Sequence, residues 1–140
     1  MQIRIKKLDS SLPDLGYAKA GDAGFDLYAR EHTVLAPGVQ TAIATGVAIE
    51  ILEGYVGLVW DKSGLSIRHG LKTLGGVVDS GYRGEVMVGM INLSTTPYTF
   101  EKGDKVAQVL IQKFEHATFE VVDELSGTER GATGFGSSGK

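Results

Sequence analysis

The sequence contains no cysteine, so neither a disulfide framework nor a thiolate metal site is possible. No apolar run approaches the roughly 18 residues of a membrane span, and the N-terminal MQIRIKKLDSSLPDL lacks an apolar segment of signal-peptide length. Lysine and arginine are scattered and the net charge is −3, so the basic stripe that nucleic-acid phosphates require is missing. These absences predict a soluble, cytoplasmic protein that binds neither nucleic acid nor a membrane.

Proline is rare and glycine abundant, with 3 and 20 residues. Glycine adopts positive φ angles and allows close backbone approach, so this composition predicts many tight turns, some of them against a ligand. A chain of 140 residues with 42% hydrophobic and 22% charged residues has the size and balance of one globular domain.

Short runs of alternating apolar and polar residues recur along the chain and predict strands. Turn signals such as Pro37-Gly38, Glu53-Gly54 and Thr96-Pro97 separate them. One short helix is expected in SGLSIRHG, with Ser63 as its N-cap and Gly70 at its end. The pattern indicates an all-β sandwich or barrel. Strands are predicted around Ile3 and Ile5 and at residues 41–45, 47–51, 55–60, 85–92, 105–113 and 118–122.

The C-terminal segment differs from the rest. From Ser126 it reads SGTERGATGFGSSGK, which has too few apolar groups to offset the entropy cost of ordering. We therefore predict a β domain over residues 1–125 and a flexible arm over residues 126–140. Arg130 and Phe135 are the exceptions within the arm, typical of one phosphate contact and one stacking ring.

Four further segments carry chemistry. Asp26 lies between apolar residues, and Lys62-Ser63-Gly64 at a helix start offers a cation, a hydroxyl and backbone amides to an anion. Residues 75–84 read as a hairpin with Asp79 and Tyr82 at its bend, and Gln108 follows Gly103-Asp104 on a strand. Each alone has an ordinary structural explanation: a turn aspartate, a helix cap, a packed tyrosine, a solvent-facing glutamine.

The order of the segments is more informative than any one of them. AGFDLYA, DKSGLS, GVVDSGYRGE, GDKVAQ and RGATGFGSSG follow one another between residues 23 and 139. In this order they resemble the five motifs of the homotrimeric dUTPase family. The resemblance implies a jelly-roll-like β-barrel or sandwich of the β-clip type and a homotrimer with active sites shared between subunits. It also implies Mg²⁺-dependent hydrolysis of dUTP to dUMP and pyrophosphate, which keeps uracil out of DNA and supplies dUMP for thymidylate synthesis.

The resemblance also implies roles for single residues. Asp79 matches the general base that activates water for attack on the α-phosphorus. Tyr82 matches the ring beneath the deoxyribose, which leaves no space for a 2′-hydroxyl. Asp26 matches an acid that contacts Mg²⁺ through water. Uracil contacts are implied for Val77, Val78, Met87 and Thr73, and a ring over uracil for Phe135. Phosphate contacts are implied for Lys62, Ser63, Gly64, Gln108, Arg130, Gly136, Ser137 and Ser138.

Three positions depart from the family pattern. Lys62 stands where arginine is usual, which gives a point charge in place of a bidentate fork. Gly81 stands where many members have a second acid, and Thr133 replaces a common glycine of the arm. None of these departures touches Asp79 or Tyr82, so the activity is expected to survive them.

Two other functions compete with this interpretation. dCTP deaminases resemble the fold but use a glutamate ten residues after the motif-three aspartate, where this sequence has Gly89. A regulatory protein that binds dUTP without turnover would be expected to lack the base or the arm. Because Asp79, Arg130 and Phe135 are all present, the enzyme is favoured over both.

Overall fold

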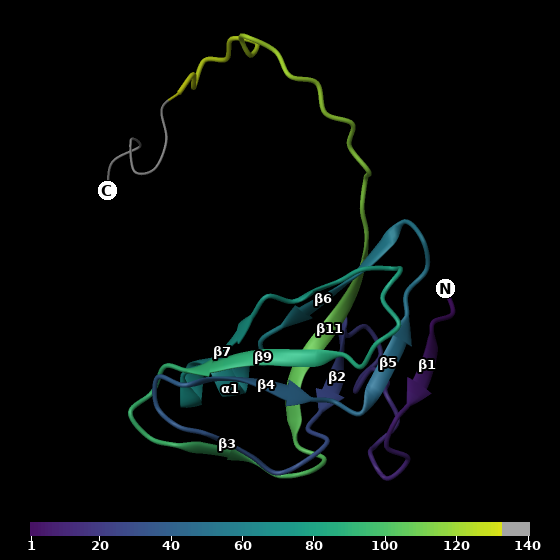
Figure 1. Ribbon diagram of the computed structural model, residues 1–140, viewed down its shortest axis with the longest axis vertical. Helices are drawn as coiled ribbons and strands as arrows, with labels where there is room; N and C mark the ends of the chain where they lie inside the picture. The colour runs from purple at the N-terminus through teal and green to yellow at the C-terminus, as the bar shows by residue number, and fades with distance from the viewer. Residues whose placement is uncertain (133–140) are drawn as a thin grey trace.

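The computed structural model describes residues 1–132 of the chain. Within them, strands form nearly all of the regular structure, and one short helix follows the sixth strand. Figure 1 shows the strands gathered in one body, which the C-terminal segment leaves as an extended line. The elements are β1 (Arg4–Lys7), β2 (Gly24–Tyr28), β3 (Thr33–Leu35), β4 (Gln40–Ala44), β5 (Val47–Glu50), β6 (Tyr55–Trp60), α1 (Ser63–His69), β7 (Leu71–Leu74), β8 (Val77–Val78), β9 (Met87–Asn92), β10 (Tyr98–Phe100) and β11 (Lys105–Lys113).

The described strands form four sheets, and all their pairings are antiparallel. The largest sheet has the order β2-β11-β6-β8, and the second has the order β4-β9-β7. Two further pairs join β1 to β5 and β3 to β10. Many of these neighbours lie far apart in the chain, so the body depends on long-range pairing. Within residues 1–132, the prediction of a β fold with one short helix is confirmed.

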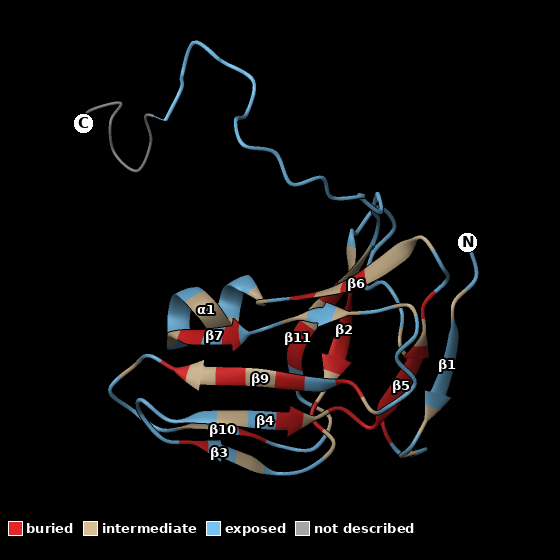
Figure 2. Ribbon diagram, turned by 45° about the horizontal axis from the view of Figure 1, so that its top comes forward, coloured by how far each residue is buried: buried red, intermediate tan, exposed pale blue. Residues whose placement is uncertain are grey.

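Alternation along the strands explains which side chains form the core. In β9 the pattern turns Val88, Met90 and Asn92 inward. In β11 the adjacent Val106 and Ala107 are both fully buried, because a register shift at the start of the strand interrupts the alternation. Figure 2 shows the buried segments concentrated on the central strands, with exposed positions at their ends and on β1.

The predicted strand ends are close to the observed ones. The predictions over residues 55–60 and 105–113 match β6 and β11 without a shift. The strand predicted over residues 85–92 begins two residues later, because Glu85 and Val86 take part in the loop that precedes β9. In that loop the Val86 N–H donates to the Val47 carbonyl at 2.9 Å.

Residues 75–84 do not form the predicted hairpin. β8 pairs with β6, whereas β9 pairs with β4 and β7, so the two flanks belong to different sheets. Gly76 permits the close approach of β8 to β6, because a Cβ atom there would lie 2.7 Å from the Val59 carbonyl oxygen, and its φ of +115° suits glycine. The bend itself is present as a turn in which the Tyr82 N–H donates to the Asp79 carbonyl at 3.1 Å.

The prediction of Ser63 as the N-cap of the helix is wrong. Ser63 is the first helical residue, and the cap position is Lys62, with φ −85° and ψ 124°. The Lys62 side chain donates to Asp26 and not to the helix terminus, so the start of α1 is oriented by a contact outside the helix. The predicted end is confirmed, since Gly70 adopts the left-handed conformation with φ 65°.

The strand predicted over residues 118–122 is also wrong. Residues 114–132 contain neither helix nor strand, and Phe119 and Val121 are 94% and 100% exposed. An alternating pattern needs a partner strand to become a strand, and this segment pairs with no described one. The domain boundary predicted at residue 126 stays a prediction. Among residues 1–132, no helix is long and apolar enough to cross a membrane.

Candidate active site

Three neighbouring strands bring Asp26 and Gln108 beside the segment that begins with Lys62. In the largest sheet, Gln108 of β11 lies opposite Asp26 of β2 on one side and Trp60 of β6 on the other. Lys62 follows two residues after the end of β6. A cavity of 350 Å³ opens here, lined by Asp26, Lys62, Lys105 and Gln108 among others. We call these four residues the basic cluster.

The charges of the basic cluster favour an anion. The Lys62 ammonium donates to one oxygen of the buried Asp26 carboxylate, and the Lys105 ammonium approaches the other at 2.7 Å. Burial alone raises the pKa of Asp26, but the hydrogen bonds from Lys105 and Lys62 outweigh it and hold the pKa below its usual value of 3.8. The hydrogen bond to Asp26 raises the pKa of Lys105. Asp22 also lines the cavity, so two ammonium groups face two carboxylates there, and the groups able to bind an anion are the two ammonium groups themselves.

The segment after Lys62 adds groups that suit phosphate. Ser63 and Gly64 begin α1 and are both exposed, next to the basic cluster. The first N–H groups of a helix have no partner within it and are free to bind an anion. Together with Lys62 they form a short run of cation, hydroxyl and backbone donors.

Magnesium is compatible with these residues only if it binds mainly through a substrate. Among residues 1–132, no group of three histidine, cysteine, aspartate or glutamate residues could hold a metal ion. Both Asp26 oxygens already bind lysines. Because Mg²⁺ keeps several of its waters, a single nearby carboxylate and a phosphate chain suffice, and Asp26 suits the contact through water.

The second group of candidate residues surrounds the Asp79 turn, which we define as residues 79–82. Asp79 is exposed at the end of β8. Tyr82 is 45% exposed, and its hydroxyl donates to the Glu85 carbonyl at 2.8 Å, which fixes the direction of its ring. Val77 and Met87, at the starts of β8 and β9, are also exposed. The turn thus presents a carboxylate and an aromatic ring to solvent on a held backbone.

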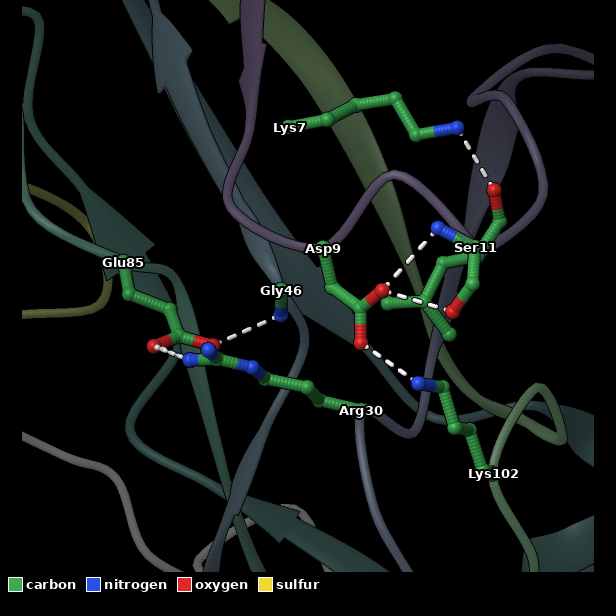
Figure 3. A network of polar contacts seen from close by, with 8 residues as sticks. Lys7, Asp9, Ser11, Arg30, Gly46, Glu85 and Lys102 are labelled. Atoms are coloured by element: carbon green, nitrogen blue, oxygen red, sulfur yellow. Dashed lines mark hydrogen bonds and ion pairs between the residues drawn. The ribbon is translucent and has the colours of Figure 1, made fainter.

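Two side chains hold the Asp79 turn in place. Figure 3 shows the Glu85 carboxylate between the Gly46 N–H, at 2.7 Å, and the Arg30 guanidinium, at 3.1 Å. The Arg83 guanidinium donates to the Ser80 and Tyr82 carbonyls at 2.6 and 2.8 Å. These bonds hold the backbone at Ser80, Tyr82 and Glu85, so the exposed Asp79 is followed by a constrained segment.

Within one copy of the chain, the basic cluster and the Asp79 turn are separated both along and across the strands of the largest sheet. Val78 pairs with Gly57, three residues before Trp60, and β8 runs antiparallel to β6. Asp79 therefore lies about 13 Å along the strands from the level of Trp60 and Asp26, and about 14 Å across three strand spacings. The combined separation is roughly 20 Å. In Figure 2 the helix that follows Lys62 lies near the arrowhead of β9, while the Asp79 loop enters β9 at the opposite end.

The remaining predicted residues are distributed as follows. Thr73 is buried, and its hydroxyl donates to Asp61 at 2.8 Å. Val78 pairs with Gly57 inside the sheet. Arg130 lies in the exposed segment that leaves the body. Phe135, Gly136, Ser137 and Ser138 lie outside the described residues.

Sequence reasoning missed three residues that contact these groups. Lys105 binds the same carboxylate, Asp26, as Lys62 does. Glu85 anchors the segment that follows the Asp79 turn. Asp61 accepts hydrogen bonds directly before Lys62. All three lie inside the quoted motifs GDKVAQ, GVVDSGYRGE and DKSGLS. The available signal was a charged residue inside a motif that also contains predicted ligand-binding residues.

Comparison with known proteins decides which family this arrangement represents. The dUTPase family model matches residues 10–139. The chain belongs to the dUTPase family. The deoxyuridine 5'-triphosphate nucleotidohydrolase of Thermobifida fusca (strain YX) is 46% identical over 142 residues, covering 99% of this chain and 79% of that protein. The protein of the same name from Nautilia profundicola is 42% identical over 142 residues and is covered completely, as is this chain.

Solved dUTPase structures share the fold. A variant of the Staphylococcus bacteriophage 80alpha dUTPase with dUpNHpp superposes with a TM-score of 0.93 at 29% identity, covering 99% of both chains. A variant of the dUTPase from phage phi11 of S. aureus, described with a structural Mg(II) ion, superposes with a TM-score of 0.82 at 26% identity, covering 89% of this chain and 98% of that one. The likeness confirms the predicted jelly-roll-like β fold.

Proposed function

We propose that this member of the dUTPase family cleaves dUTP between its α- and β-phosphates, with Asp79 as the base that activates water. Family membership makes the chain a dUTP diphosphatase. The observation that carries the mechanism is that the fold presents both an anion site, the basic cluster, and the exposed carboxylate of Asp79 on a turn with a constrained backbone. Products of the reaction are dUMP and pyrophosphate, so the enzyme both removes a uracil precursor of DNA and supplies dUMP for thymidylate synthesis.

The basic cluster binds the triphosphate. Lys62 provides charge, Ser63 and Gly64 provide hydroxyl and backbone donors, and Gln108 provides a side-chain amide. Arg130 contacts the γ-phosphate. Asp26 would hold Mg²⁺ through water, and the ion would supply positive charge to the phosphate oxygens. The ammonium groups of Lys62 and Lys105 beside the cavity support this assignment. Gly136, Ser137 and Ser138 add phosphate contacts from the arm.

Asp79 carries the proton transfer. Water is a weak nucleophile at neutral pH, and a positioned carboxylate accepts its proton as the new P–O bond forms at the α-phosphorus. The bond from that phosphorus to the bridging oxygen breaks, and pyrophosphate leaves with the electron pair. The bonds made by Arg83 and Glu85 support this role, because they hold the backbone that carries Asp79 before substrate arrives.

The nucleoside lies against the Asp79 turn. Backbone groups around Val77, Val78 and Met87 recognise the uracil edge, with Thr73 as a further polar contact, and the Phe135 ring covers the base. Fixed backbone donors and acceptors reject cytosine, whose N3 and N4 present the opposite pattern. Tyr82 lies beneath the deoxyribose, where its ring fills the space that a 2′-hydroxyl needs. Its half-exposed ring, held by the bond to Glu85, supports this role.

A complete site requires more than one copy of the chain. A general base must lie within about 3 Å of the water whose proton it accepts. Asp79 and the basic cluster of one chain are separated by roughly 20 Å, on the spacing of the strands that carry them. We therefore assign Asp79 and the basic cluster of each site to different subunits of a homotrimer.

Hydrolysis in ¹⁸O-labelled water tests the direction of attack. We expect one ¹⁸O atom in dUMP and none in pyrophosphate, because water attacks the α-phosphorus. The reaction should stop when EDTA removes Mg²⁺ and resume when Mg²⁺ is restored. Label in pyrophosphate would contradict the proposed mechanism while leaving the family membership intact.

Tyr82→Ala tests sugar selection. Removing the ring opens space beside C2′, so the ratio of kcat/KM for UTP to that for dUTP should rise by at least about tenfold. The two nucleotides are assayed in competition, and Tyr17→Ala, which removes another half-exposed tyrosine, is the matched control. An equal loss of activity on both nucleotides would show that the ring does not exclude the 2′-hydroxyl.

A further inference from the structure

Asp61, the residue directly before Lys62, joins three strands. One carboxylate oxygen accepts hydrogen bonds from the Thr73 N–H at 2.6 Å and the Thr73 hydroxyl at 2.8 Å. The other accepts from the Lys72 ammonium at 2.5 Å. The Asp61 carbonyl accepts from the Gln108 side-chain amide at 2.9 Å. Asp61 thus ties the end of β6 to β7 and β11 at the point where the chain turns into α1.

The helix after Asp61 packs on the body mainly through half-buried Leu65 and the His69 ring, which both lie beyond its first two residues. None of the residues of α1 is buried, and no side chain caps its start. The position of Ser63 and Gly64 therefore depends on the segment that leads into the helix. Besides the Lys62 contact with Asp26, that segment is anchored by Asp61, whose side chain is 19% exposed and accepts three hydrogen bonds.

The Asp61 carboxylate is ionised in this position. Burial alone raises its pKa, but the hydrogen bonds from Lys72 and Thr73 outweigh burial and hold the pKa below the usual value of 3.8. Charge-assisted hydrogen bonds of this kind are shorter and stronger than neutral ones. The anchor is therefore present throughout the neutral pH range.

We propose that Asp61 is a positioning residue for the triphosphate. It fixes the backbone of Lys62, Ser63 and Gly64 through its own side chain, and it holds the Gln108 amide through its carbonyl. A side-chain amide has two N–H groups, so one of those on Gln108 remains for a phosphate oxygen. This inference rests on the proposed phosphate-binding role of the basic cluster. Asp61 itself touches no substrate.

Comparing two ligands separates positioning from plain stability. dUpNHpp carries the full triphosphate chain, whereas dUMP lacks the β- and γ-phosphates. Full-length wild type, Asp61→Ala and Asp61→Asn are titrated calorimetrically with each ligand in Mg²⁺, and thermal unfolding reports whether each variant is folded. Asp14→Ala, which removes an acid whose side chain is 91% exposed, is the matched control.

Asp61→Ala should weaken dUpNHpp binding by about tenfold, because binding then has to order groups that Asp61 orders in advance. dUMP binding should stay within about twofold, since the nucleoside contacts lie on the Asp79 turn. Asp61→Asn keeps an oxygen for Thr73 and loses the Lys72 ion pair, so a loss of about threefold is expected. In steady-state kinetics, both variants should have a higher KM for dUTP than wild type, and the increase should be larger for Asp61→Ala than for Asp61→Asn.

Other outcomes would overturn the proposal. One is a folded Asp61→Ala variant with unchanged affinity for dUpNHpp. The other is a folded Asp61→Ala variant that loses affinity for dUpNHpp and for dUMP by the same factor. If Asp61→Ala does not fold, Asp61→Asn decides: an unchanged dUpNHpp affinity rejects the positioning role. Failure of wild type itself to bind dUpNHpp or to hydrolyse dUTP would instead reject the proposed function of the site.

Discussion

Replacing Asp79 with asparagine should lower the turnover of dUTP by about 10²- to 10⁴-fold, the usual contribution of a positioned base. The amide keeps the shape of the side chain but cannot accept a proton from water. The turn should survive, because its closing bond runs from the Tyr82 N–H to the main-chain carbonyl of residue 79 and its other anchors are Arg83 and Glu85. dUTP and Mg²⁺ should therefore still bind.

Pyrophosphate release measures the loss of turnover, and calorimetric titration with dUpNHpp measures whether binding is retained. Asp14→Asn is the control, since it makes the same chemical change on an exposed loop. Its turnover should equal that of wild type. Turnover by Asp79→Asn at the wild-type rate would mean that another group activates the water.

Reversing the charge of Lys62 should have the second large effect. Lys62→Glu changes the net charge of Lys62, Lys105 and Asp26 from +1 to −1, counted from two ammonium groups and one carboxylate. A triphosphate then meets repulsion where it met attraction, and interactions between such partly buried charges are weakly screened. We expect kcat/KM for dUTP to fall by at least about 10²-fold.

Two further variants show whether the Lys62 effect is electrostatic. Lys62→Met keeps the stem and removes the charge, and its loss should be about tenfold. Lys113→Glu, at the exposed end of β11, makes the same reversal away from the cavity and should be neutral. If Lys62→Glu is folded and kcat/KM is unchanged, the basic cluster does not bind the triphosphate.

The sequence predicts the long strands well, since each contains enough alternation to define its period. β6 and β11 match their predicted residues, and the end of α1 at Gly70 follows from a glycine in the left-handed conformation. Short strands are different. β3 and β10 have three residues each and pair with each other across more than sixty positions, so nothing local predicts them.

Pairing also explains the incorrect predictions. Residues 118–122 alternate like a strand but have no partner among the described residues, and they remain exposed. Residues 75–84 have the glycines and the turn of a hairpin, yet Gly76 allows β8 to approach Val59 of β6, and the flanks enter different sheets. Local pattern gives the turn, whereas tertiary contacts decide which strands it joins.

The residue types of the candidate site could be predicted through the resemblance, but their grouping could not. The fold reveals that Asp26 lies between Lys62 and Lys105 and that Gln108 lies one strand away from Asp26. It also separates these residues from Asp79 by several strand positions. That separation depends on the register of β8 against β6, which a single sequence does not disclose.

We assign Asp79 and the basic cluster of one site to different copies of the chain. Mixing Asp79→Asn with Lys62→Glu tests this assignment most directly, because each variant alone is nearly inactive and each retains the group that the other lacks. After subunit exchange, with mixed assemblies verified by native mass spectrometry, dUTP hydrolysis should rise well above the sum of the separate variants. If mixed assemblies form and activity stays at that sum, each chain carries a whole site and the sites are not shared between copies.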